Sequence, residues 1–430
     1  MQKRNLLIII LFLFTGTIGW SAERIRQNFD FDWQFRLGEQ GIYKPVQLPH
    51  DWSIELDFNE EVGPESGYLP GGIGYYKKDF NVPASYKGKR VSIVFDGIYH
   101  KATIYLNGQE VDYHRYGYTS FETDLTPYLK YGGKNTLSVK VDHSEKSRWY
   151  TGSGIYRHGW MQVTNPIHVK MWGTYITTPR VSAESAIVSC VTTVANTSAL
   201  TGEIEIMQRI VDAQGNLLKI NGKQYAARTE VVMPENGTKD IAQSFTLSNP
   251  QLWNLEKPYL YRLETILKQK GKVIDRYTTR FGVRTIGFDK DKGFFLNGKN
   301  IKMKGACLHQ DAGCLGVAVP NRSYERRLTI LKEFGANAIR CSHNPPSPEF
   351  LNYCDSIGFL VVDEAFDKWK SGYYEQFFDE CWQQDIRDMI VRDRNHPSIV
   401  LWSIGNELAE ATRKDNVGVD CLLYTSPSPR

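Results

Sequence analysis

The sequence predicts a multidomain chain of β plus α/β class: a jelly-roll β-sandwich, an immunoglobulin-like β-sandwich and the first half of a (β/α)8 TIM barrel. Two observations lead to this prediction. Up to about residue 285, short alternating apolar runs are interrupted by Gly, Pro and Asn, without long helical periodicity. After residue 287, near-continuously apolar runs alternate with helical segments, as in a parallel sheet that is covered on both faces. With 430 residues, of which 41% are hydrophobic and 23% charged, the chain can bury several cores and is not disordered.

Residues 1–21 are expected to be a secretory signal peptide. Lys3 and Arg4 precede an apolar run at 6–14, and small residues lead to a cleavage position near Ser21 or Ala22. A membrane anchor is the alternative, but the apolar stretch is shorter than the roughly 20 residues that a spanning helix needs. We therefore expect a secreted protein that has no membrane contact after cleavage and is periplasmic if the source is a Gram-negative bacterium.

Residues 24–173 are predicted to form the jelly-roll domain. The runs at 91–95, 102–106 and 137–141 alternate between outward and inward side chains. Asn107-Gly108 supplies the positive-φ turn that closes a hairpin after the second run. Short strands without helices are typical of a sandwich of this kind.

Residues 174–285 are predicted to form the second sandwich. The segment contains strand-like runs at 186–191 and 261–265, and its length of roughly 100 residues is that of an immunoglobulin-like domain. The disulfide of that fold is missing from the pattern.

The cysteines indicate neither a disulfide framework nor a metal site. There are seven of them, an odd number, and no pair has zinc-ribbon or C-x-x-C spacing. Cys190, Cys307 and Cys341 lie in apolar runs and are expected to be buried. No cofactor motif is evident; a structural divalent cation or a sodium ion is the alternative. The net charge of only +4 argues against a nucleic-acid partner.

Residues 287–416 are predicted to form the N-terminal half of the barrel, since a complete barrel needs about 250 residues. The tail at 417–430 has neither helical period nor strand alternation, and we interpret it as non-native sequence; a disordered C-terminus is the alternative. The expected elements of the barrel half are a strand at 301–306, a helix at 323–334 capped by Ser323, a strand at 336–340, a helix at 348–357, a strand at 359–362, a helix at 375–393 and a strand at 399–404.

The four predicted barrel strands all end in polar residues. In barrels of this kind the reactive groups lie at the carboxyl ends of the strands, so this pattern predicts an active site. The four strand ends are Leu308-His309-Gln310-Asp311, Arg340-Cys341-Ser342-His343-Asn344, Asp363-Glu364 and Gly405-Asn406-Glu407.

Two kinds of chemistry could use these strand ends. A metal site could draw on His309, His343, Asp363 and Glu407, but none of them has the close spacing that preorganises ligands. Glycoside hydrolysis by two carboxylates is the favoured alternative. Glu407 is the best candidate for the acid, because burial near Trp402 is expected to raise its pKa and keep it protonated.

The chain resembles glycoside hydrolase family 2 from about residue 28 to 416. The motifs that carry the resemblance occur in the order of that family: Leu48-Pro49-His50-Asp51-Trp52, Gly72-Ile73-Gly74-Tyr75-Tyr76, Arg148-Trp149-Tyr150-Thr151-Gly152-Ser153-Gly154-Ile155-Tyr156-Arg157, Phe281-Gly282-Val283-Arg284, Asn337-Ala338-Ile339-Arg340, Ser342-His343-Asn344-Pro345-Pro346, Asp363-Glu364-Ala365, Arg394-Asn395-His396-Pro397-Ser398 and Trp402-Ser403-Ile404-Gly405-Asn406-Glu407.

The resemblance implies a retaining double-displacement mechanism with Glu407 as the acid/base. It also implies a set of residues that line or shape the sugar subsite: Asn406, His309, Arg340, His343, Asn344, Asp363 and His396. Two of these have a structural alternative: Arg340 could pair with a carboxylate such as Asp363 beneath the site, and His396 stands at the start of the fourth strand.

The nucleophile implied by the family is a second Glu at the end of strand seven, which this chain does not reach. Glu364 is not a replacement for it, because the third strand lies far round the barrel from that position. We therefore expect the chain to be a truncated fragment that does not fold natively alone and is inactive.

The expected substrate is a β-linked galactoside or an oligosaccharide that carries one. Residues 308–313 and 315–320 resemble β-galactosidases of the family more than its β-glucuronidases or β-mannosidases, which are the alternatives. Arg148 could reach the site as a cation for a uronate, but we favour a cap on its own hairpin. A noncatalytic carbohydrate-binding protein with a decayed barrel is a further alternative, and an oligomer is possible.

Overall fold

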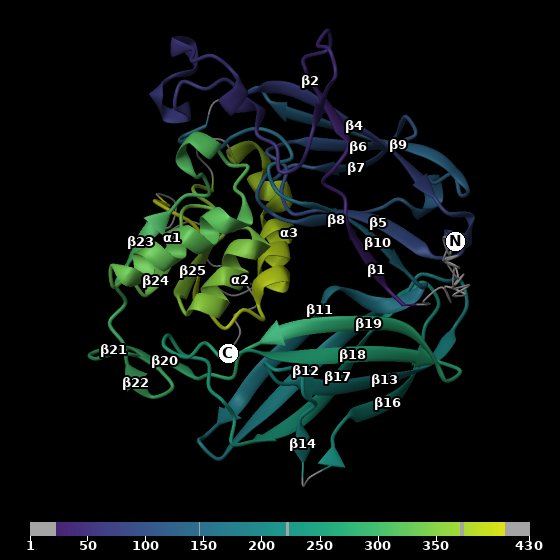
Figure 1. Cartoon of the computed structure of the whole chain (residues 1–430), viewed down its shortest axis with the longest axis vertical. Coiled ribbons are helices and arrows are strands. Elements are labelled where there is room, and N and C mark those ends of the chain that lie inside the picture. The colour runs from purple at the N-terminus through teal and green to yellow at the C-terminus, as the bar shows by residue number, and fades with distance from the viewer. Residues whose placement is uncertain (1–22, 146, 221–222, 370–373, 409–430) are drawn as a thin grey trace, which may run out of the picture.

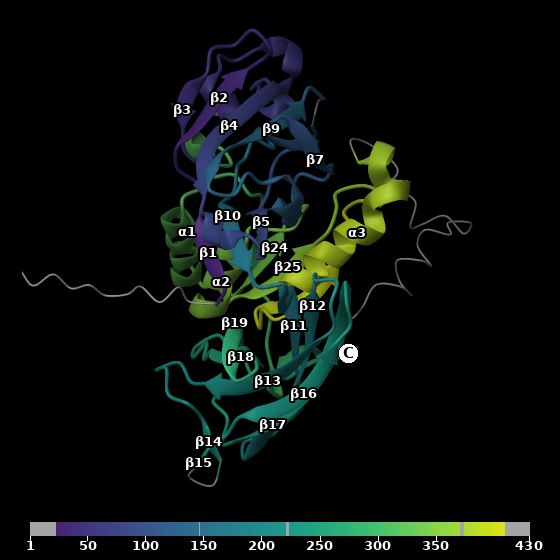
Figure 2. The same ribbon diagram turned by 90° about the vertical axis from the view of Figure 1, so that its right-hand side faces the viewer.

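The computed structural model describes residues 23–408 apart from 146, 221–222 and 370–373. The predicted signal peptide at 1–21 and the predicted tail at 417–430 lie outside the described residues, as does 409–416. Within the described ranges, no helix combines the length and the apolar character that a membrane span requires. Figures 1 and 2 show the predicted order of two β-sandwiches and a parallel βα segment, which confirms the fold class.

The first sandwich encloses an aromatic core between two antiparallel sheets. Trp33 and Tyr76 are completely buried in this core. Asn107 and Gly108 have φ angles of 54° and 85°, which confirms the predicted hairpin turn. The sheet orders are β1-β10-β5-β8 and β3-β2-β4-β9-β6-β7. The elements are β1 (Ile25–Asn28), β2 (Trp33–Leu37), β3 (Lys44–Val46), η1 (Trp52–Glu55), η2 (Glu60–Val62), η3 (Pro64–Ser66), β4 (Gly72–Val82), η4 (Ala84–Tyr86), β5 (Arg90–Phe95), β6 (Ala102–Leu106), β7 (Gln109–His114), β8 (Phe121–Asp124), η5 (Thr126–Tyr128), β9 (Gly133–His143) and β10 (Gly159–Thr164).

The second sandwich has one sheet of order β11-β12-β17 and another of order β16-β13-β18-β19. Val188, Leu263 and Phe281 pack between them, and Cys190 is buried there as predicted. Strand β11 pairs with β12 from Ile167 onward, so it crosses residue 173, where the first sandwich was predicted to end. The elements are β11 (Ile167–Val181), β12 (Ser185–Asn196), β13 (Gly202–Val211), β14 (Lys219–Ile220), β15 (Lys223–Gln224), β16 (Ala227–Met233), β17 (Gly237–Ser248), β18 (Tyr261–Gln269) and β19 (Lys272–Phe281).

The barrel segment, β23 to β26 with α1 to α3, is a four-stranded parallel sheet in sequential order (Figure 1). A small antiparallel sheet of β20 to β22 precedes it. The elements are β20 (Ile286–Asp289), β21 (Gly293–Leu296), β22 (Lys299–Asn300), β23 (Gly305–Leu308), η6 (Gly313–Leu315), α1 (Asn321–Glu333), β24 (Ala338–Cys341), α2 (Pro348–Ile357), β25 (Leu360–Glu364), α3 (Glu375–Asp393) and β26 (Ile399–Ser403).

Three details of the barrel segment differ from the prediction. Strand β23 begins at Gly305 rather than at 301, because only from there does the chain pair with β24. Helix α1 begins at Asn321 and is preceded by the extended Pro320, so Ser323 lies inside the helix and does not cap it. Cys307 is exposed, as are Gly305 and Ala306, since β23 is an edge strand that pairs only with β24 among the described residues.

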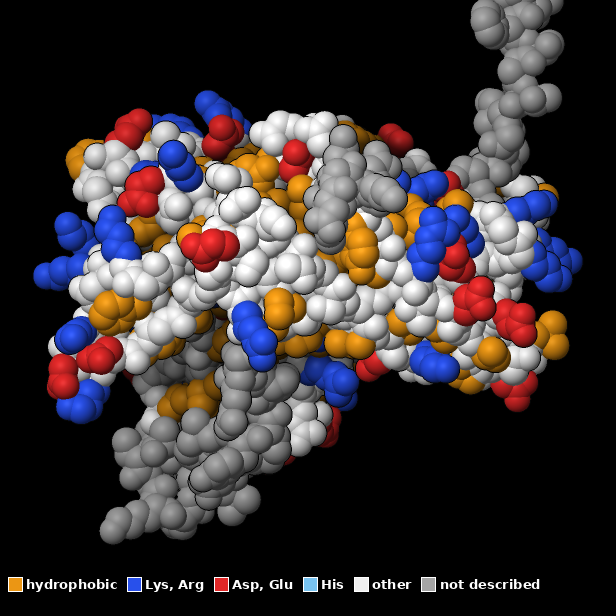
Figure 3. All heavy atoms as spheres, turned by 90° about the horizontal axis from the view of Figure 1, so that it is seen from below, with side chains coloured by type: hydrophobic (Ala, Val, Ile, Leu, Met, Phe, Trp, Pro, Cys, Tyr) orange, Lys and Arg blue, Asp and Glu red, His pale blue; other side chains and the backbone are white. Residues whose placement is uncertain are grey.

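The barrel segment packs against both sandwiches (Figure 2). Tyr99 and Tyr116 of the first sandwich share a buried aromatic cluster with Phe366 and Tyr374 of the barrel segment. Arg284, after β19, donates to backbone carbonyls at both ends of the Pro397–Ile399 segment that leads into β26. Figure 3 shows the face at the lower end of the molecule, where basic and acidic side chains are interspersed.

Candidate active site

The residues that follow the carboxyl ends of β23 to β26, here called the rim, all lie at one edge of the sheet. Parallel pairing places Arg340 opposite Val362 and Glu364 opposite Ser403. Because side chains alternate along a strand, Glu364 lies on the same face of the sheet as Val362 and thus as Arg340. The register alone therefore brings a cation and a carboxylate together at the rim.

Glu364 is the buried centre of the rim. Its carboxylate accepts hydrogen bonds from Arg340 Nη2 at 2.7 Å and Arg340 Nε at 2.9 Å, and from Ser403 Oγ at 2.6 Å. His343 Nδ1 lies 2.7 Å from its other oxygen. Burial raises the pKa of Glu364, but the hydrogen bonds from His343, Ser403 and Arg340 outweigh it and hold the pKa below its ordinary value. Glu364 is therefore an ionised carboxylate that positions its neighbours.

Asp363 does not join this group, and the expectation that it pairs with Arg340 is wrong. It is the neighbour of Glu364 on the strand, so its fully buried side chain faces the other side of the sheet, next to Asp393 and Arg392 of α3. Its carboxylate oxygens have no hydrogen-bond partner among the described residues. Burial, followed by the charge of Asp393, raises the pKa of Asp363 well above its ordinary value.

Asn406 is fixed from two sides. Its side-chain oxygen accepts a hydrogen bond from Arg340 Nη2 at 3.0 Å, and its side-chain nitrogen donates to Asp367 Oδ1 at 2.9 Å. Its backbone N–H donates to the carbonyl of Asp367 at 2.7 Å. The segment that carries Glu407 is therefore held against the loop after β25.

Glu407 is exposed, which contradicts the prediction of a buried acid with a raised pKa. Its side chain is 64% exposed, and Lys368 Nζ donates to Oε2 at 2.6 Å. Arg148 Nη2 lies 3.4 Å from the same oxygen. The hydrogen bond and the charge of Lys368, together with the charge of Arg148, lower the pKa of Glu407. Trp402 does not desolvate it, because the chain leaves β26 after Ser403 and turns Glu407 outward with a φ of 47°.

Arg148 reaches the rim from the first sandwich and does not cap its own hairpin. Its Nη1 donates to Asp367 Oδ2 at 2.7 Å in addition to the longer contact with Glu407. Arg148 and Asn406 therefore hold the two carboxylate oxygens of Asp367 between them. The prediction of a hairpin cap failed because the partners of Arg148 are more than 200 residues away in the sequence.

Buried Asp51 anchors the loop that carries Arg148. Its carboxylate accepts hydrogen bonds from the backbone N–H groups of Ser53, Ser153 and Val317 and from the hydroxyl of Tyr150. Val317 belongs to the loop after β23, so one carboxylate joins the first sandwich to the barrel segment. At Gly152, with a φ of 65°, a Cβ atom would lie 2.0 Å from a methyl group of Val317, so the close approach of the two domains requires glycine.

Trp149, His309 and His343 form an aromatic group at the rim. The ring centre of Trp149 lies 5.1 Å from that of His309 and 5.7 Å from that of His343, and the two histidine rings are 5.4 Å apart. Trp149 Nε1 and His309 Nδ1 are buried and have no partner among the described residues. Burial, with the neighbouring His343, lowers the pKa of His309, so this ring is a neutral hydrogen-bonding group.

Two further predicted site residues lie away from this group. Asn344 is buried, and its Nδ2 donates to the carbonyl of Pro345 at 3.1 Å. His396 stands just before β26, at the opposite end of that strand from Glu407. Its Nδ1 lies 2.6 Å from Asp355 Oδ2; burial lowers the pKa of His396, but the charge of Asp355 outweighs this and raises it. The geometry therefore favours a structural role for His396 over contact with a sugar.

The geometry suits proton transfer and sugar recognition better than metal binding. No group of three or more His, Cys, Asp or Glu side chains that could hold a metal ion occurs among the described residues. The alternative metal site of His309, His343, Asp363 and Glu407 is not formed, because Asp363 faces away from the rim. Glu407 can exchange a proton at the surface, and the partly exposed rings of Trp149 and His309 can pack against the apolar face of a sugar.

The sequence-based reasoning missed Asp367, Lys368 and Trp149 as rim residues; it placed Glu364 at the rim but did not identify it as the partner of Arg340. The signal for Glu364 was available, because Arg340 and Glu364 fall on one face once the strands are aligned in parallel. Lys368 and Asp367 lie in a loop, where no period predicts the direction of a side chain.

Three family models match consecutive parts of the chain. They are described as Glycosyl hydrolases family 2, sugar binding domain, at residues 30–170; Glycosyl hydrolases family 2, at 167–284; and Glycosyl hydrolases family 2, TIM barrel domain, at 289–418.

Curated relatives and solved structures agree with these matches. The chain is 44% identical over 410 residues to the beta-galactosidase BoGH2A of Bacteroides ovatus, covering 90% of this chain and 47% of that protein. It is 30% identical over 422 residues to a beta-glucuronidase of Bacteroides fragilis, covering 93% and 59%. A glycosyl hydrolase family 2 member from Bacteroides cellulosilyticus superposes with a TM-score of 0.85 at 40% identity, covering 89% of this chain and 52% of that one. The chain thus spans about half the length of the relatives it matches.

Proposed function

Because the chain belongs to glycosyl hydrolases family 2, we propose that the whole protein hydrolyses terminal β-galactosides as a retaining exo-glycosidase. The observation that carries the proposal is the junction of Asn406 and Glu407 at the end of β26. Asn406 is locked by Arg340 and Asp367, so Glu407 is held at a defined point of the rim, which also carries the aromatic group of Trp149, His309 and His343.

In the proposed first step, protonated Glu407 donates its proton to the glycosidic oxygen while a second carboxylate forms a bond to the anomeric carbon and the leaving sugar departs. In the second step, the Glu407 carboxylate takes a proton from water, whose oxygen replaces the enzyme at that carbon. Lys368 and Arg148 favour the ionised form before substrate binds. Glu407 contacts Arg148 at 3.4 Å and Lys368 at 2.6 Å. We expect an entering sugar to displace the longer contact, the one with Arg148.

Glu364 is not the second carboxylate in this proposal. Four donor atoms occupy it, and its oxygens are buried beneath the rim. Asp367 is not free either, because its two carboxylate oxygens accept hydrogen bonds from Arg148 and Asn406. We therefore expect the 430-residue chain by itself not to turn over a glycoside.

A galactoside is the favoured substrate, because identity is 44% to a protein named as a beta-galactosidase, against 37% to a putative beta-glucuronidase of Formosa agariphila. A β-glucuronide is the second candidate, and a specific observation favours it. Arg148 and Lys368 place two cations beside Glu407, where they could also bind a uronate carboxylate.

The test is hydrolysis of aryl β-galactosides, β-glucuronides and β-mannosides by the complete protein. We expect β-galactosides to have the highest kcat/KM, and a preference for β-glucuronides would favour the second candidate. Glu407→Gln should abolish turnover of substrates with poor leaving groups, which need the proton. An activated leaving group should still be released in a first burst, but its turnover should be slow because the second step lacks its base. Glu333→Gln, an exposed carboxylate at the end of α1, is the matched control. Full activity of Glu407→Gln on poor leaving groups would contradict the assignment.

We also propose that the protein is exported, on the pattern of residues 1–21. Cell fractionation followed by N-terminal sequencing tests this. A mature protein that begins near Glu23 in the periplasmic or secreted fraction supports export, and an intact leader in the cytoplasm contradicts it.

A further inference from the structure

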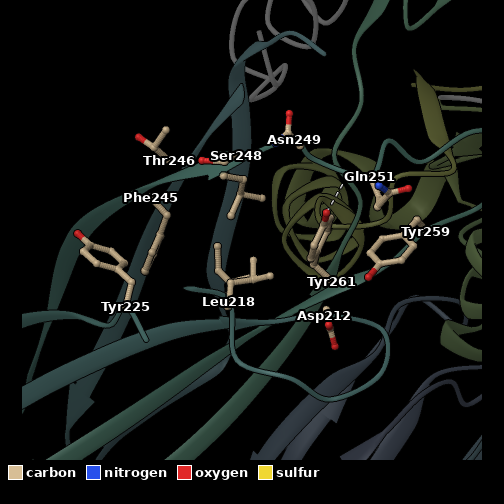
Figure 4. A pocket seen from close by; sticks show the side chains of 12 residues that line it. Asp212, Leu218, Tyr225, Phe245, Thr246, Ser248, Asn249, Gln251, Tyr259 and Tyr261 are labelled. Carbon is tan, nitrogen blue, oxygen red and sulfur yellow. Dashed lines mark hydrogen bonds between the residues drawn. The ribbon is translucent and has the colours of Figure 1, made fainter. Parts of the chain in front are cut away.

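A cavity of 190 Å³ lies in the second sandwich, apart from the rim (Figure 4). It opens at the end of the sandwich where β13 and β17 finish and β18 begins, near β14 in Figure 1. Its floor is apolar: Ile210, Phe245 and Leu247 are all buried. None of the cavity's lining residues takes part in the contacts described at the rim.

Aromatic rings form two sides of this cavity. Tyr225 and Phe245 stand on one side in an edge-to-face arrangement, with ring centres 5.7 Å apart. Tyr259 and Tyr261 stand on the other side, with ring centres 4.9 Å apart (Figure 4). Tyr225 is 41% exposed, so its ring is accessible to a ligand at the cavity edge.

The cavity edge carries neutral hydrogen-bonding groups. The side-chain amides of Asn249 and Gln251 are exposed and have no partner among the described residues. Tyr261 Oη accepts a hydrogen bond from the backbone N–H of Gln251 at 2.8 Å, which leaves its own proton available (Figure 4). The carboxylate of Asp212 is already used by the backbone N–H groups of its own turn.

These features select one ligand chemistry. The lining contains no Lys or Arg and one carboxylate, so an anion is disfavoured. Aromatic sides suit the apolar face of a pyranose ring, and amides and hydroxyls suit its edge. The volume is below the roughly 300–1,000 Å³ of pockets for drug-sized ligands, which indicates a single ring.

We propose that this cavity is a noncatalytic binding site for one neutral hexose unit of a glycan. The inference goes beyond the proposed hydrolysis and does not depend on it. A bound unit here would hold a longer glycan against the protein, independently of the chemistry at the rim.

The test uses the complete protein with Glu407→Gln, so that the probes are not turned over, and methyl β-D-galactopyranoside and methyl β-D-glucopyranoside as probes in saturation-transfer difference NMR. We expect at least one glycoside to bind, and Tyr225→Ala and Gln251→Ala each to weaken that binding at least tenfold. Both side chains are exposed at the cavity edge, so these variants should fold. Tyr113→Ala, at an equally exposed tyrosine of the first sandwich, is the matched control and should change nothing.

Trp149→Ala separates this site from the rim. Binding that survives Trp149→Ala and is lost in Tyr225→Ala supports the proposal. Binding that is lost only in Trp149→Ala, or a folded chain that binds neither glycoside, overturns it. If neither sugar binds but an apolar dye does, and Tyr225→Ala abolishes binding of the dye, the cavity is a hydrophobic defect of the sandwich end. This result also overturns the proposal.

Discussion

Replacing Arg340 with methionine tests whether Glu364 is an ionised, buried carboxylate that depends on its partner. The variant removes two hydrogen bonds to Glu364, at 2.7 and 2.9 Å, and one to Asn406, at 3.0 Å. It leaves His343 and Ser403 as the remaining partners of Glu364. Removing one partner of a buried ion pair costs about 3–5 kcal/mol of the free energy of unfolding. Because the Arg340 side chain is 35% exposed and the Glu364 side chain fully buried, we expect the low end, about 3 kcal/mol at pH 7.

The cost should depend on pH in a definite direction. In the wild type the pKa of Glu364 is below its ordinary value, so its stabilising contribution is complete above that value and is lost as the pH falls through the folded pKa. Without Arg340, the pKa of Glu364 should rise, because burial remains while one of the groups that lower the pKa is gone. The destabilisation of the variant should therefore be largest at neutral pH and shrink as the pH falls through the pKa of Glu364 in the variant.

Urea unfolding followed by circular dichroism and tryptophan fluorescence, at neutral and acidic pH, measures both effects. The double variant Arg340→Met with Glu364→Gln should recover most of the stability, because no buried charge remains. Arg209→Met is the control: its partner Glu264 lies at 2.7 Å, but both side chains are about one-third exposed, so we expect a loss of at most about 1 kcal/mol. A cost for Arg340→Met that equals the control, or that is the same at both pH values, would refute the reasoning.

The contacts between the first sandwich and the rim predict three more outcomes. Asp51→Ala should destabilise the chain by about 3 kcal/mol in thermal unfolding, because it leaves several buried donors without an acceptor; Asp57→Ala, at an exposed position, should have no effect. In the complete enzyme, Trp149→Ala should raise KM at least tenfold and change kcat less, since the ring is assigned to sugar binding; a loss confined to kcat contradicts that role. Arg148→Met should raise the pKa of Glu407 and move the alkaline limb of the kcat/KM profile to higher pH, because the acid must be protonated; an unmoved limb means that Arg148 does not act on Glu407.

Elements with local signals could be predicted closely from the sequence. Helix α2 has the predicted bounds because Ser347 accepts a hydrogen bond from the Phe350 N–H, Pro348 begins the helix and Gly358 ends it in the left-handed conformation. Helix α1 was less well predicted because Ser323 has the residue type of a cap but lies two residues inside the helix.

The rim could be located from the sequence, but its ion pairs could not. Asp363 and Glu364 are adjacent carboxylates, and composition does not tell them apart. Strand alternation assigns them to opposite faces, and only the pairing with β24 and β26 decides which face carries Arg340.

The sequence by itself determined the order of the domains, the alternation of strands and helices, and the four polar strand ends, because each of these depends on neighbouring residues and their periodicity. Only the tertiary structure decided that Glu364 rather than Asp363 faces Arg340, that Glu407 is exposed with a lowered pKa, and that Arg148 crosses from the first sandwich to the rim. The physical reason is that burial and ion pairing depend on the packing of distant segments: Arg148 and Glu407 are 259 residues apart in the chain, and no local pattern specifies which charges a folded chain brings within reach.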